Sequence, residues 1–440
     1  MKGISGFPEW LPQEQRIVDH ILGVIREIFE LYGFGSVETP AVEKVDTLLS
    51  KGDDHEIYGL YRLADPQGGR QRDLALRFDL TVPLARYVAQ YGGELCFPYK
   101  RYHIGPVWRG ERPQAGRYRQ FTQCDIDIVG QEELPLAYDG EVIAVMQQVF
   151  SALHLNDFVL RLNNRKIFFG LMASFGLENI KAGKVLRILD KVGKLSLADI
   201  LQLLQLQALP KTLLQILMDM ASGAGSSDLQ ELRSLCDHRE FQQGITELEE
   251  VMDVADEFGA TQNMIVDLSL VRGLSYYTGT LYEGTLKSHP SLGSVCGGGR
   301  YGNLVERLAA SQKSFPGVGA SLGISRLLSI LMQKEVFRGL RLTPAWVLVT
   351  CQDRQSRSAY LKLSRLLRDG GIATEIYLDQ KSLKAQMKYA DKKGFPFVVV
   401  ANAQELEAEV VVLRDLRQKS QQRVNWDELV EVIEKKIAEQ

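Results

Sequence analysis

The chain has 440 residues, 45% of them hydrophobic and 24% charged, so it is long enough for roughly two or three domains with substantial cores. Its five cysteines include no CxxC pair, which argues against a disulfide framework and favours a reducing compartment. No apolar stretch approaches the roughly 18 residues of a membrane span and the N-terminus has no hydrophobic signal core, so we expect a cytosolic protein.

The formal net charge of −3 gives no hint of a polyanionic partner, but the charge is unevenly distributed along the chain. Residues 344–440 carry 16 Lys and Arg against 14 Asp and Glu, whereas the remainder carries 36 against 41. Within the tail, residues 379–393 are rich in lysine, but such a run is usually a solvated helix face. The six histidines are scattered, and Cys236 with His238 is too small a set to predict a zinc site.

The first predicted element is a long amphipathic helix over residues 13–32, with apolar side chains at helical spacing and Gly33 as its C-terminal stop. Residues 34–43 then become extended, because Pro40 excludes the interior of a helix. Taken alone, this is an ordinary helix followed by a strand.

Alternating strands and turns are predicted for residues 73–130. Residues 101–130 read as an antiparallel hairpin whose long loop carries Arg112, Arg117 and Arg119, and basic tips of this kind often have no partner. On the returning strand, polar side chains at every second position share one face, and that face is costly to bury unless a ligand or partner satisfies it. These residues are Gln123, Asp125 and Asp127.

A similar alternation places Asp79 and Thr81 on one face, where a carboxylate and a hydroxyl can both accept hydrogen bonds from an ammonium group. A helix at 140–153 and a strand at 158–163 follow. Residues 177–258 are then rich in Leu, Lys, Asp and Glu at three- and four-residue spacing, which predicts a helical insertion. Strands return over 264–286, and 317–331 reads as a strand running into a helix.

From residue 345 onwards, short apolar strands alternate with helices, and a last helix spans 427–438. This pattern predicts a separate small α/β domain with a mostly parallel sheet.

The most informative stretch is RGLSYYTGTLYE, residues 272–283. Arg272 follows an apolar run, and its guanidinium can grip a carboxylate or a phosphate with two parallel hydrogen bonds. Tyr276 and Tyr277 would point to opposite faces of the next strand, so that one lines a pocket while the other packs. The spacing fits equally well a tight hairpin with two core tyrosines.

This stretch resembles the signature peptide of histidyl-tRNA synthetases, which usually reads RGLDYYTG; Ser275 stands where that family has Asp. Further segments follow in the family's order across nearly the whole chain. The resemblance implies a class II α+β catalytic domain built on an antiparallel sheet over residues 1–335, with the helical insertion at about 177–258. It also implies a C-terminal α/β anticodon-binding domain over 344–440.

The hairpin at 101–130 resembles motif 2 of class II synthetases, and the resemblance implies an ATP site. Arg109 would hold the α-phosphate, Glu111 would face the adenine, Phe121 would stack on it, and Arg326 would bind the γ-phosphate as the motif 3 arginine. The loop residues Arg112, Gln114 and Arg117 would contact the acceptor end of the tRNA.

The same resemblance implies a histidine site. Gln123 would bind the backbone end of histidine, and Asp127 would read the imidazole N–H together with a tyrosine of the 276/277 pair. The clamp for the amino group would be Asp79, Leu80 and Thr81, with Arg109 and Arg272 beside the reacting carboxylate. CGGGRYGNL, residues 296–304, resembles the family's GGGRYDGL, with Gly302 and Asn303 in place of Asp-Gly.

The expected reaction has two steps: histidine attacks the α-phosphate of ATP, and the terminal ribose of histidine tRNA then takes the histidyl group. Arg109 and Arg272 would flank the α-phosphate, and Mg²⁺ would bridge phosphate oxygens without dedicated protein ligands. Motif 1, the helix and strand before Pro40, implies a homodimer.

Two alternatives stay open. One is a catalytically silent paralogue that senses histidine, such as the regulatory subunit of ATP phosphoribosyltransferase. The other is a pseudo-synthetase module that only binds uncharged tRNA. Relatives of the first kind typically lack the C-terminal domain, and those of the second should have lost the ATP residues. This chain has the C-terminal domain and also the ATP residues.

Overall fold

The computed structural model describes residues 3–50, 56–63, 73–114, 116–192, 195–223, 227–260, 263–271, 277–302, 304–308, 313–334 and 343–439. The chain divides into two compact units, one formed by Met1–Glu9 with His20–Leu331 and the other by Trp10–Asp19 with Met332–Gln440.

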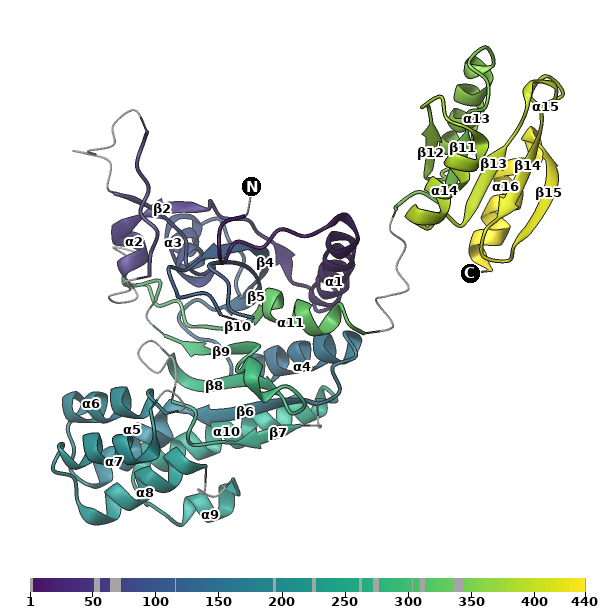
Figure 1. The fold of residues 1–440 in the computed structure, drawn as a ribbon. Helices are drawn as coiled ribbons and strands as arrows, with labels where there is room; N and C mark the ends of the chain where they lie inside the picture. Colours follow the sequence, from purple (N-terminus) through teal and green to yellow (C-terminus); the bar gives the residue numbers. More distant parts are fainter. Residues whose placement is uncertain are drawn as a thin grey trace. The chain divides into compact units, whose positions relative to one another are not determined.

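An eight-stranded sheet forms the centre of the first unit (Figure 1). Its strand order is β1-β4-β5-β10-β9-β8-β6-β7, and every pairing is antiparallel except β1 with β4 and β6 with β7. The predicted antiparallel architecture is therefore confirmed. The strands are β1 (Gly35–Ser36), β4 (Tyr99–Trp108), β5 (Gln120–Val129), β6 (Phe158–Asn164), β7 (Met264–Val266), β8 (Tyr277–Leu286), β9 (Cys296–Tyr301) and β10 (Gly317–Gly323).

One face of this sheet is apolar and is covered by helices. On β5, Cys124, Ile126 and Ile128 alternate with the polar residues and are fully buried. Lys100 and Arg300 lie in the same cross-strand row as Ile128 and therefore point to the same side of the sheet. The helix α4 (Ala137–Ala152) packs on this side, because its Asp139 pairs with Arg300 at 2.5 Å and its Glu141 pairs with Lys100 at 2.5 Å. The opposite face is therefore the one that carries Gln123, Asp125 and Asp127.

The other N-terminal elements lie before β4 in the chain. The predicted first helix is confirmed, with Gly33 beyond its end at φ +77°. A helix that was not predicted begins at Thr81, and its Pro83 lies in the first turn, where the missing N–H costs no hydrogen bond. The elements are α1 (Pro12–Leu31), β2 (Val42–Lys44), α2 (Val45–Leu49), β3 (Leu74–Leu76) and α3 (Thr81–Tyr91).

The helical insertion is also as predicted. Its last helix packs against α4 and α5 and so anchors the insertion to the sheet. The motif CGGGRY forms a strand, and 317–331 is a strand running into a helix. The helices of this region are α5 (Arg165–Ser174), α6 (Asn179–Leu189), α7 (Leu197–Gln205), α8 (Lys211–Ser222), α9 (Leu229–Arg233), α10 (Arg239–Glu257), the 3-10 turn η1 (Pro290–Leu292) and α11 (Ile324–Leu331).

A five-stranded sheet of order β12-β11-β13-β14-β15 forms the second unit. Two of its pairings are parallel and two are antiparallel, so the prediction of a mostly parallel sheet was wrong. The elements are β11 (Val347–Thr350), α13 (Arg357–Asp369), β12 (Thr374–Tyr377), α14 (Leu383–Lys393), β13 (Phe397–Val400), α15 (Ala403–Glu407), β14 (Val410–Asp415), β15 (Ser420–Asn425) and α16 (Trp426–Ala438).

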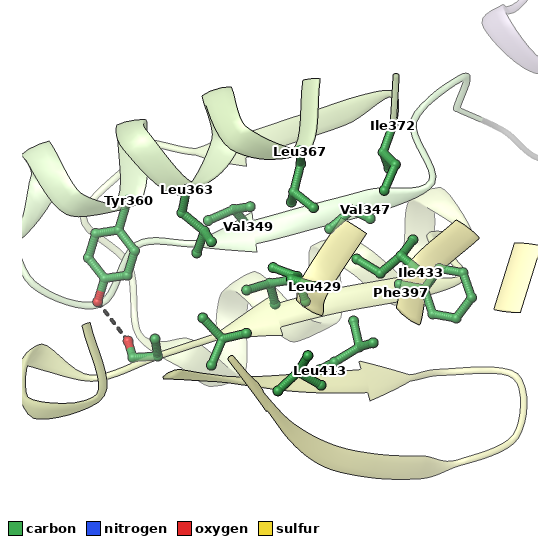
Figure 2. Close-up of a cluster of buried hydrophobic side chains, with 14 of the residues drawn as sticks. Val347, Val349, Tyr360, Leu363, Leu367, Ile372, Phe397, Leu413, Leu429 and Ile433 are labelled. Atoms are coloured by element: carbon green, nitrogen blue, oxygen red, sulfur yellow. Dashed lines mark hydrogen bonds between the residues drawn. The ribbon is translucent and has the colours of Figure 1, made fainter. Parts of the chain in front are cut away.

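Apolar side chains fill both sides of this second sheet. Figure 2 shows one cluster, in which Leu363 of α13 and Ile433 of α16 meet Val347 and Phe397 of the sheet. Leu348 lies in a second cluster with its neighbours from β13 and α14. Alternate residues of β11 thus face two separate apolar layers, which explains why its sequence is apolar throughout.

All five cysteines lie within the described residues and are free thiols. Among the described helices, none is both long and apolar enough to cross a membrane.

Candidate active site

The register of three adjacent strands builds a block of polar side chains on the face of the large sheet that lies opposite α4. Residues directly opposite one another on antiparallel strands point to the same side. Asp125 of β5 lies opposite His103 of β4 and Ser321 of β10, and the next row places Asp127 opposite Arg101 and Gly319. The alternation read from β5 alone is therefore part of a two-dimensional array.

Glycines leave the room that this array needs. A Cβ on Gly319 would lie 2.2 Å from Oδ1 of Asp127, and a Cβ on Gly317 would lie 2.3 Å from the ring of Tyr301. With hydrogen in these places, the Tyr301 ring can lie over β10 and reach Asp127. Any larger residue at 319 would push the Asp127 carboxylate out of position.

Asp127 is held firmly although only 3% of its surface is exposed. Its Oδ2 lies 2.6 Å from Nη2 of Arg101, and its Oδ1 accepts a hydrogen bond of 2.9 Å from the Tyr301 hydroxyl. The same Nη2 of Arg101 donates to the carbonyl of Leu80 at 3.2 Å. A buried cation thus joins the Asp127 carboxylate to the backbone that precedes α3.

Asp125 has a different environment. Burial raises the pKa of its carboxyl to about 7, while Arg101 and a hydrogen bond from Ser321 act to lower it and Asp127 and Asp79 act to raise it. Burial, together with the charges of Arg101 and Arg77, lowers the pKa of neighbouring His103 to about 3. His103 is therefore neutral at physiological pH, and the Asp125 carboxyl changes its protonation state close to that pH.

A cavity of about 160 Å³ opens over these residues. From the predicted histidine set, Asp79, Thr81 and Tyr277 border it beside members of the array. Leu80 does not line it; its contribution is the carbonyl that Arg101 binds. The full polar lining is Asp79, Thr81, Arg109, Gln123, Asp125, Asp127, Tyr277, Tyr301 and Ser321.

The reason given for placing Asp79 and Thr81 together was wrong, although both reach the cavity. They do not alternate along a strand, because Thr81 is the first residue of α3. Asp79 lies just before that helix, and its Oδ1 accepts a hydrogen bond of 3.1 Å from the backbone N–H of Val82. The helix start, rather than a strand, directs the two side chains to one place.

A second cavity, of about 330 Å³, contains the complete predicted ATP set, which is Arg109, Glu111, Phe121 and Arg326. The Arg109 guanidinium carbon lies 5.0 Å from the centroid of the Phe121 ring, and its Nε donates to the Phe78 carbonyl at 3.0 Å. Glu111 forms an ion pair of 2.7 Å with Arg117, while Arg326 donates to the carbonyls of Gly116 and Ser294. The volume of this second cavity, without that of the first, lies within the range of roughly 300–1,000 Å³ that is usual for small-molecule sites.

The two cavities share part of their walls. Arg109, Gln123, Gly297 and Ser321 line both of them. A ligand in the larger cavity and one in the smaller cavity would therefore meet beside the Arg109 guanidinium, which is a donor suited to carboxylate and phosphate oxygens. This arrangement can bring two substrates into reacting distance.

The hairpin loop was predicted to carry a basic tip, and in the structure Arg112, Gln114 and Arg117 are all exposed. Backbone hydrogen bonds in both directions join Gln114 to Arg117. At the base of the loop, the Gly6 carbonyl accepts hydrogen bonds from the N–H groups of Arg119 and Gln120 at 2.8 and 3.1 Å. The N-terminal segment therefore fixes the base of the loop and leaves its tip exposed.

The first five residues of the signature stretch, 272–276, lie outside the described residues, and they include Arg272, Ser275 and Tyr276. Its described neighbours are held on both sides by the end of β6 and the start of α5. The Asn163 side-chain amide donates to the carbonyls of Leu268 and Leu270 at 3.4 and 3.0 Å, and Arg165 donates to the carbonyl of Tyr277.

Four residues of the polar array were not predicted as site residues from the sequence: Arg101, His103, Ser321 and Tyr301. Arg101 carried a local signal, since it stands in a strand whose partner bears buried carboxylates. Tyr301 stands in the motif CGGGRYGNL, but nothing in the sequence linked it to Asp127. Ser321 carried no signal, because only the pairing of β10 with β5 brings it to the array.

Comparisons with known proteins give matches over nearly the whole chain. The family model for histidyl-tRNA synthetase matches residues 6–327, and the model for an anticodon binding domain matches residues 346–436. A histidine-tRNA ligase from Nostoc punctiforme is 38% identical, with 99% of this chain and 97% of the relative covered. One from Thermobifida fusca is 41% identical, with 90% of each chain covered.

Among solved structures, a crystal structure of histidyl-tRNA synthetase from Nostoc sp. superimposes with a TM-score of 0.85. It is 37% identical in sequence, and 99% of each chain is covered.

Proposed function

The chain belongs to the histidyl-tRNA synthetase family and is a histidine-tRNA ligase, and we propose that its two adjoining cavities hold ATP and histidine side by side. The observation that carries this proposal is the shared wall. Arg109 lines both cavities, so a carboxylate in the smaller one and an α-phosphate in the larger one would both lie next to its guanidinium.

The first step joins the carboxylate of histidine to the α-phosphate of ATP and releases pyrophosphate. An α-carboxyl group with a pKa near roughly 3.5 is already an anion at neutral pH, so the step needs no general base. The chain has to align two anions and to neutralise their charge. Arg109, which lines both cavities, would do this, with Arg272 as its partner on sequence grounds.

In the larger cavity, Phe121 would stack on the adenine and Glu111 would face its edge, while Arg326 would bind the γ-phosphate and the leaving pyrophosphate. The carbonyls of Gly116 and Ser294 hold the Arg326 guanidinium inside the cavity lining. A preorganised cation of this kind needs no rearrangement when charge develops on the leaving group.

The residues present fit Mg²⁺ only as an ion carried mainly by ATP. Among the described parts of the chain, no three His, Cys, Asp or Glu side chains form a group that could hold a metal. Glu283 lines the larger cavity and would offer one carboxylate, and Mg²⁺ commonly binds through one or two carboxylates plus phosphate oxygens. When bound, the ion would neutralise charge on the phosphates.

In the smaller cavity, Asp79 and Thr81 would accept hydrogen bonds from the amino group, Gln123 would bind the backbone end, and Asp127 would accept from the imidazole N–H. Arg101 and Tyr301 fix the Asp127 carboxylate. An analogue without the matching donor would leave buried acceptors unpaired, which gives strong discrimination.

In the second step, a ribose hydroxyl at the 3′ end of the tRNA attacks the histidyl-adenylate and releases AMP. We propose that Arg112, Gln114 and Arg117 contact the acceptor end, because they are exposed at the tip of the hairpin beside the larger cavity. The anticodon would be bound by residues 344–440, with residues 1–335 as the catalytic domain. A chain ending near residue 341 should then keep histidine activation but charge tRNA poorly.

We further propose that the protein works in the cytosol as a homodimer through its motif 1 helix. Sedimentation of the purified chain tests the dimer, and a monomer that is fully active would contradict it.

Histidine-dependent exchange of labelled pyrophosphate into ATP tests the enzyme directly. We expect exchange with histidine and with no other common amino acid. Intact histidine binding without any exchange would favour the silent, histidine-sensing paralogue instead, although the match of residues 346–436 to an anticodon binding domain already speaks against that alternative.

A further inference from the structure

Asp125 is a buried carboxylate for which the proposed reaction has so far no use. It stands between Gln123 and Asp127 on β5, lines the smaller cavity, and only 2% of its surface is exposed. An ionisable group in such a place costs stability unless something compensates its charge.

A short chain of hydrogen bonds orients this carboxylate. The side-chain amide of Gln123 donates to the Ser321 hydroxyl at 2.5 Å, and Ser321 in turn forms a side-chain hydrogen bond with Asp125. A hydroxyl has a single proton, so when it accepts from Gln123 it donates to Asp125. The chain therefore runs from the amide through the hydroxyl to the carboxylate.

Two acceptors remain unused at the ends of this chain. Oε1 of Gln123 and Oδ1 of Asp125 are buried, and no donor from the described residues reaches either of them. The two residues are two positions apart on one strand, so their Cα atoms are about 7 Å apart and their side chains project in the same direction. Buried polar atoms are almost always paired, so two neighbouring acceptors of this kind indicate a donor that comes from the ligand.

The chemistry of the pair selects the donor. A neutral imidazole has one N–H and can serve one acceptor, whereas an ammonium group has three N–H donors and a positive charge. Asp79, Asp125 and Asp127 all line the cavity, and of these Asp127 already accepts from Arg101 and Tyr301. A cation placed at Asp125 would compensate the carboxylate that lacks a full set of donors.

We propose that Asp125 is a substrate-binding residue whose Oδ1, together with Oε1 of Gln123, binds the α-ammonium group of histidine. This inference rests on the proposed function of the smaller cavity and extends it. Asp125 then adds a second carboxylate to the predicted amino-group clamp of Asp79 and Thr81. Arg101 and Tyr301 hold Asp127 in place, and Asp127 would bind the imidazole end of the substrate.

Two histidine analogues test this with the full-length protein. Histidinol keeps the ammonium and the imidazole, whereas imidazole-propionate keeps the imidazole and the carboxylate but has no ammonium. Calorimetry should show that Asp125→Asn weakens histidinol binding by roughly 10- to 100-fold, the usual effect of a hydrogen bond to a charged group. Binding of imidazole-propionate should change by no more than about twofold.

Asp139→Asn is the matched control, because it removes a buried carboxylate from the opposite side of the same sheet. It should leave the ratio of the two affinities unchanged. If Asp125→Asn weakens both analogues equally, or neither, the assignment is wrong. Should Asp125→Asn fail to fold, Ser321→Ala keeps the carboxylate and removes its donor, and an unchanged affinity for histidinol would equally overturn the proposal.

The proposed function can fail separately. The wild-type protein could bind histidinol through Asp125 and yet show no histidine-dependent pyrophosphate exchange. That result would contradict the proposed activation of histidine but not the proposed ammonium site at Asp125.

Discussion

The two sheets of this protein bury opposite kinds of side chain. The five-stranded sheet has apolar layers on both sides, built by residues such as Val347 and Leu348 that alternate along β11. The eight-stranded sheet has one apolar side and one side with Arg101, Asp125 and Asp127, each no more than 3% exposed. The first arrangement favours stability, and the second sacrifices stability to hold charges in fixed positions.

The difference shows what each sheet asks of its sequence. A sheet with two apolar layers accepts many residues of similar volume, since the hydrophobic effect has no direction. A buried polar array works only if each member has its partner and its space, as Asp127 does with Arg101, Tyr301 and Gly319. Changes in the array should therefore cost more than changes of equal size in the apolar layers.

The largest effect is expected from Asp127→Ala, which leaves the guanidinium of Arg101 buried without its carboxylate. Breaking a buried ion pair on one side typically costs about 3–5 kcal/mol. Urea denaturation should show this loss for the first unit, with a raised KM for histidine in any protein that stays folded. A loss below about 1 kcal/mol would mean that the array is not the costly part of the molecule.

Arg109→Ala tests the array at the shared wall of the two cavities. Removing one donor to the transition state costs about 10²–10³-fold in rate, so the rate of pyrophosphate exchange should fall by this factor. Stability should change little, because Arg109 makes one hydrogen bond to the Phe78 carbonyl and stacks near Phe121. Arg109→Lys is the control, since it keeps the charge and loses the planar fork. A full rate with Arg109→Ala would remove Arg109 from the mechanism.

The sequence predicted best what depends on local patterns. The helix now seen as α1, the β4 and β5 hairpin and the helical insertion follow from spacing within one segment. Local patterns failed where a strand and the start of a helix have the same pattern of polar and apolar residues. Asp79 and Thr81 were assigned to a strand, because two polar residues at alternate positions hid the start of α3.

What the sequence could not give was the pairing between distant strands. Ser321 and Tyr301 belong to the site because β10 lies between β5 and β9, although Tyr301 is 174 positions from Asp127 in the chain. In the other sheet, β15 was missed because its residues, from Ser420 onwards, are mostly polar and exposed at an edge. Side-chain periodicity carries no signal there.

A third prediction uses the pH dependence of stability. The Asp125 pKa is raised to about 7, above the usual unfolded value of about 3.9, so the folded state holds this proton longer than the unfolded state does. Its contribution to stability is present below the unfolded pKa and is lost as the pH rises through about 7. Between pH 6 and 8 the loss amounts to about 1.4 kcal/mol for one group.

Urea denaturation without ligand should reveal this decrease in wild-type protein, and Asp125→Asn should lack it. Asp139, whose pKa burial raises to about 6, remains in both proteins and cancels in the comparison. Equal pH profiles for the two proteins would mean that Asp125 stays ionised throughout.

The smallest effect is expected from Ile433→Val in the apolar layer drawn in Figure 2. Ile433 is fully buried against the five-stranded sheet, and the change removes one methylene group from a layer that can partly close around it. The second unit should lose about 0.5–1.5 kcal/mol in urea denaturation, and the rate of pyrophosphate exchange should not change. A loss above that of Asp127→Ala would reverse the ranking of the two sheets. An altered exchange rate would show that the second unit affects histidine activation, which the separate cores of the two units give no reason to expect.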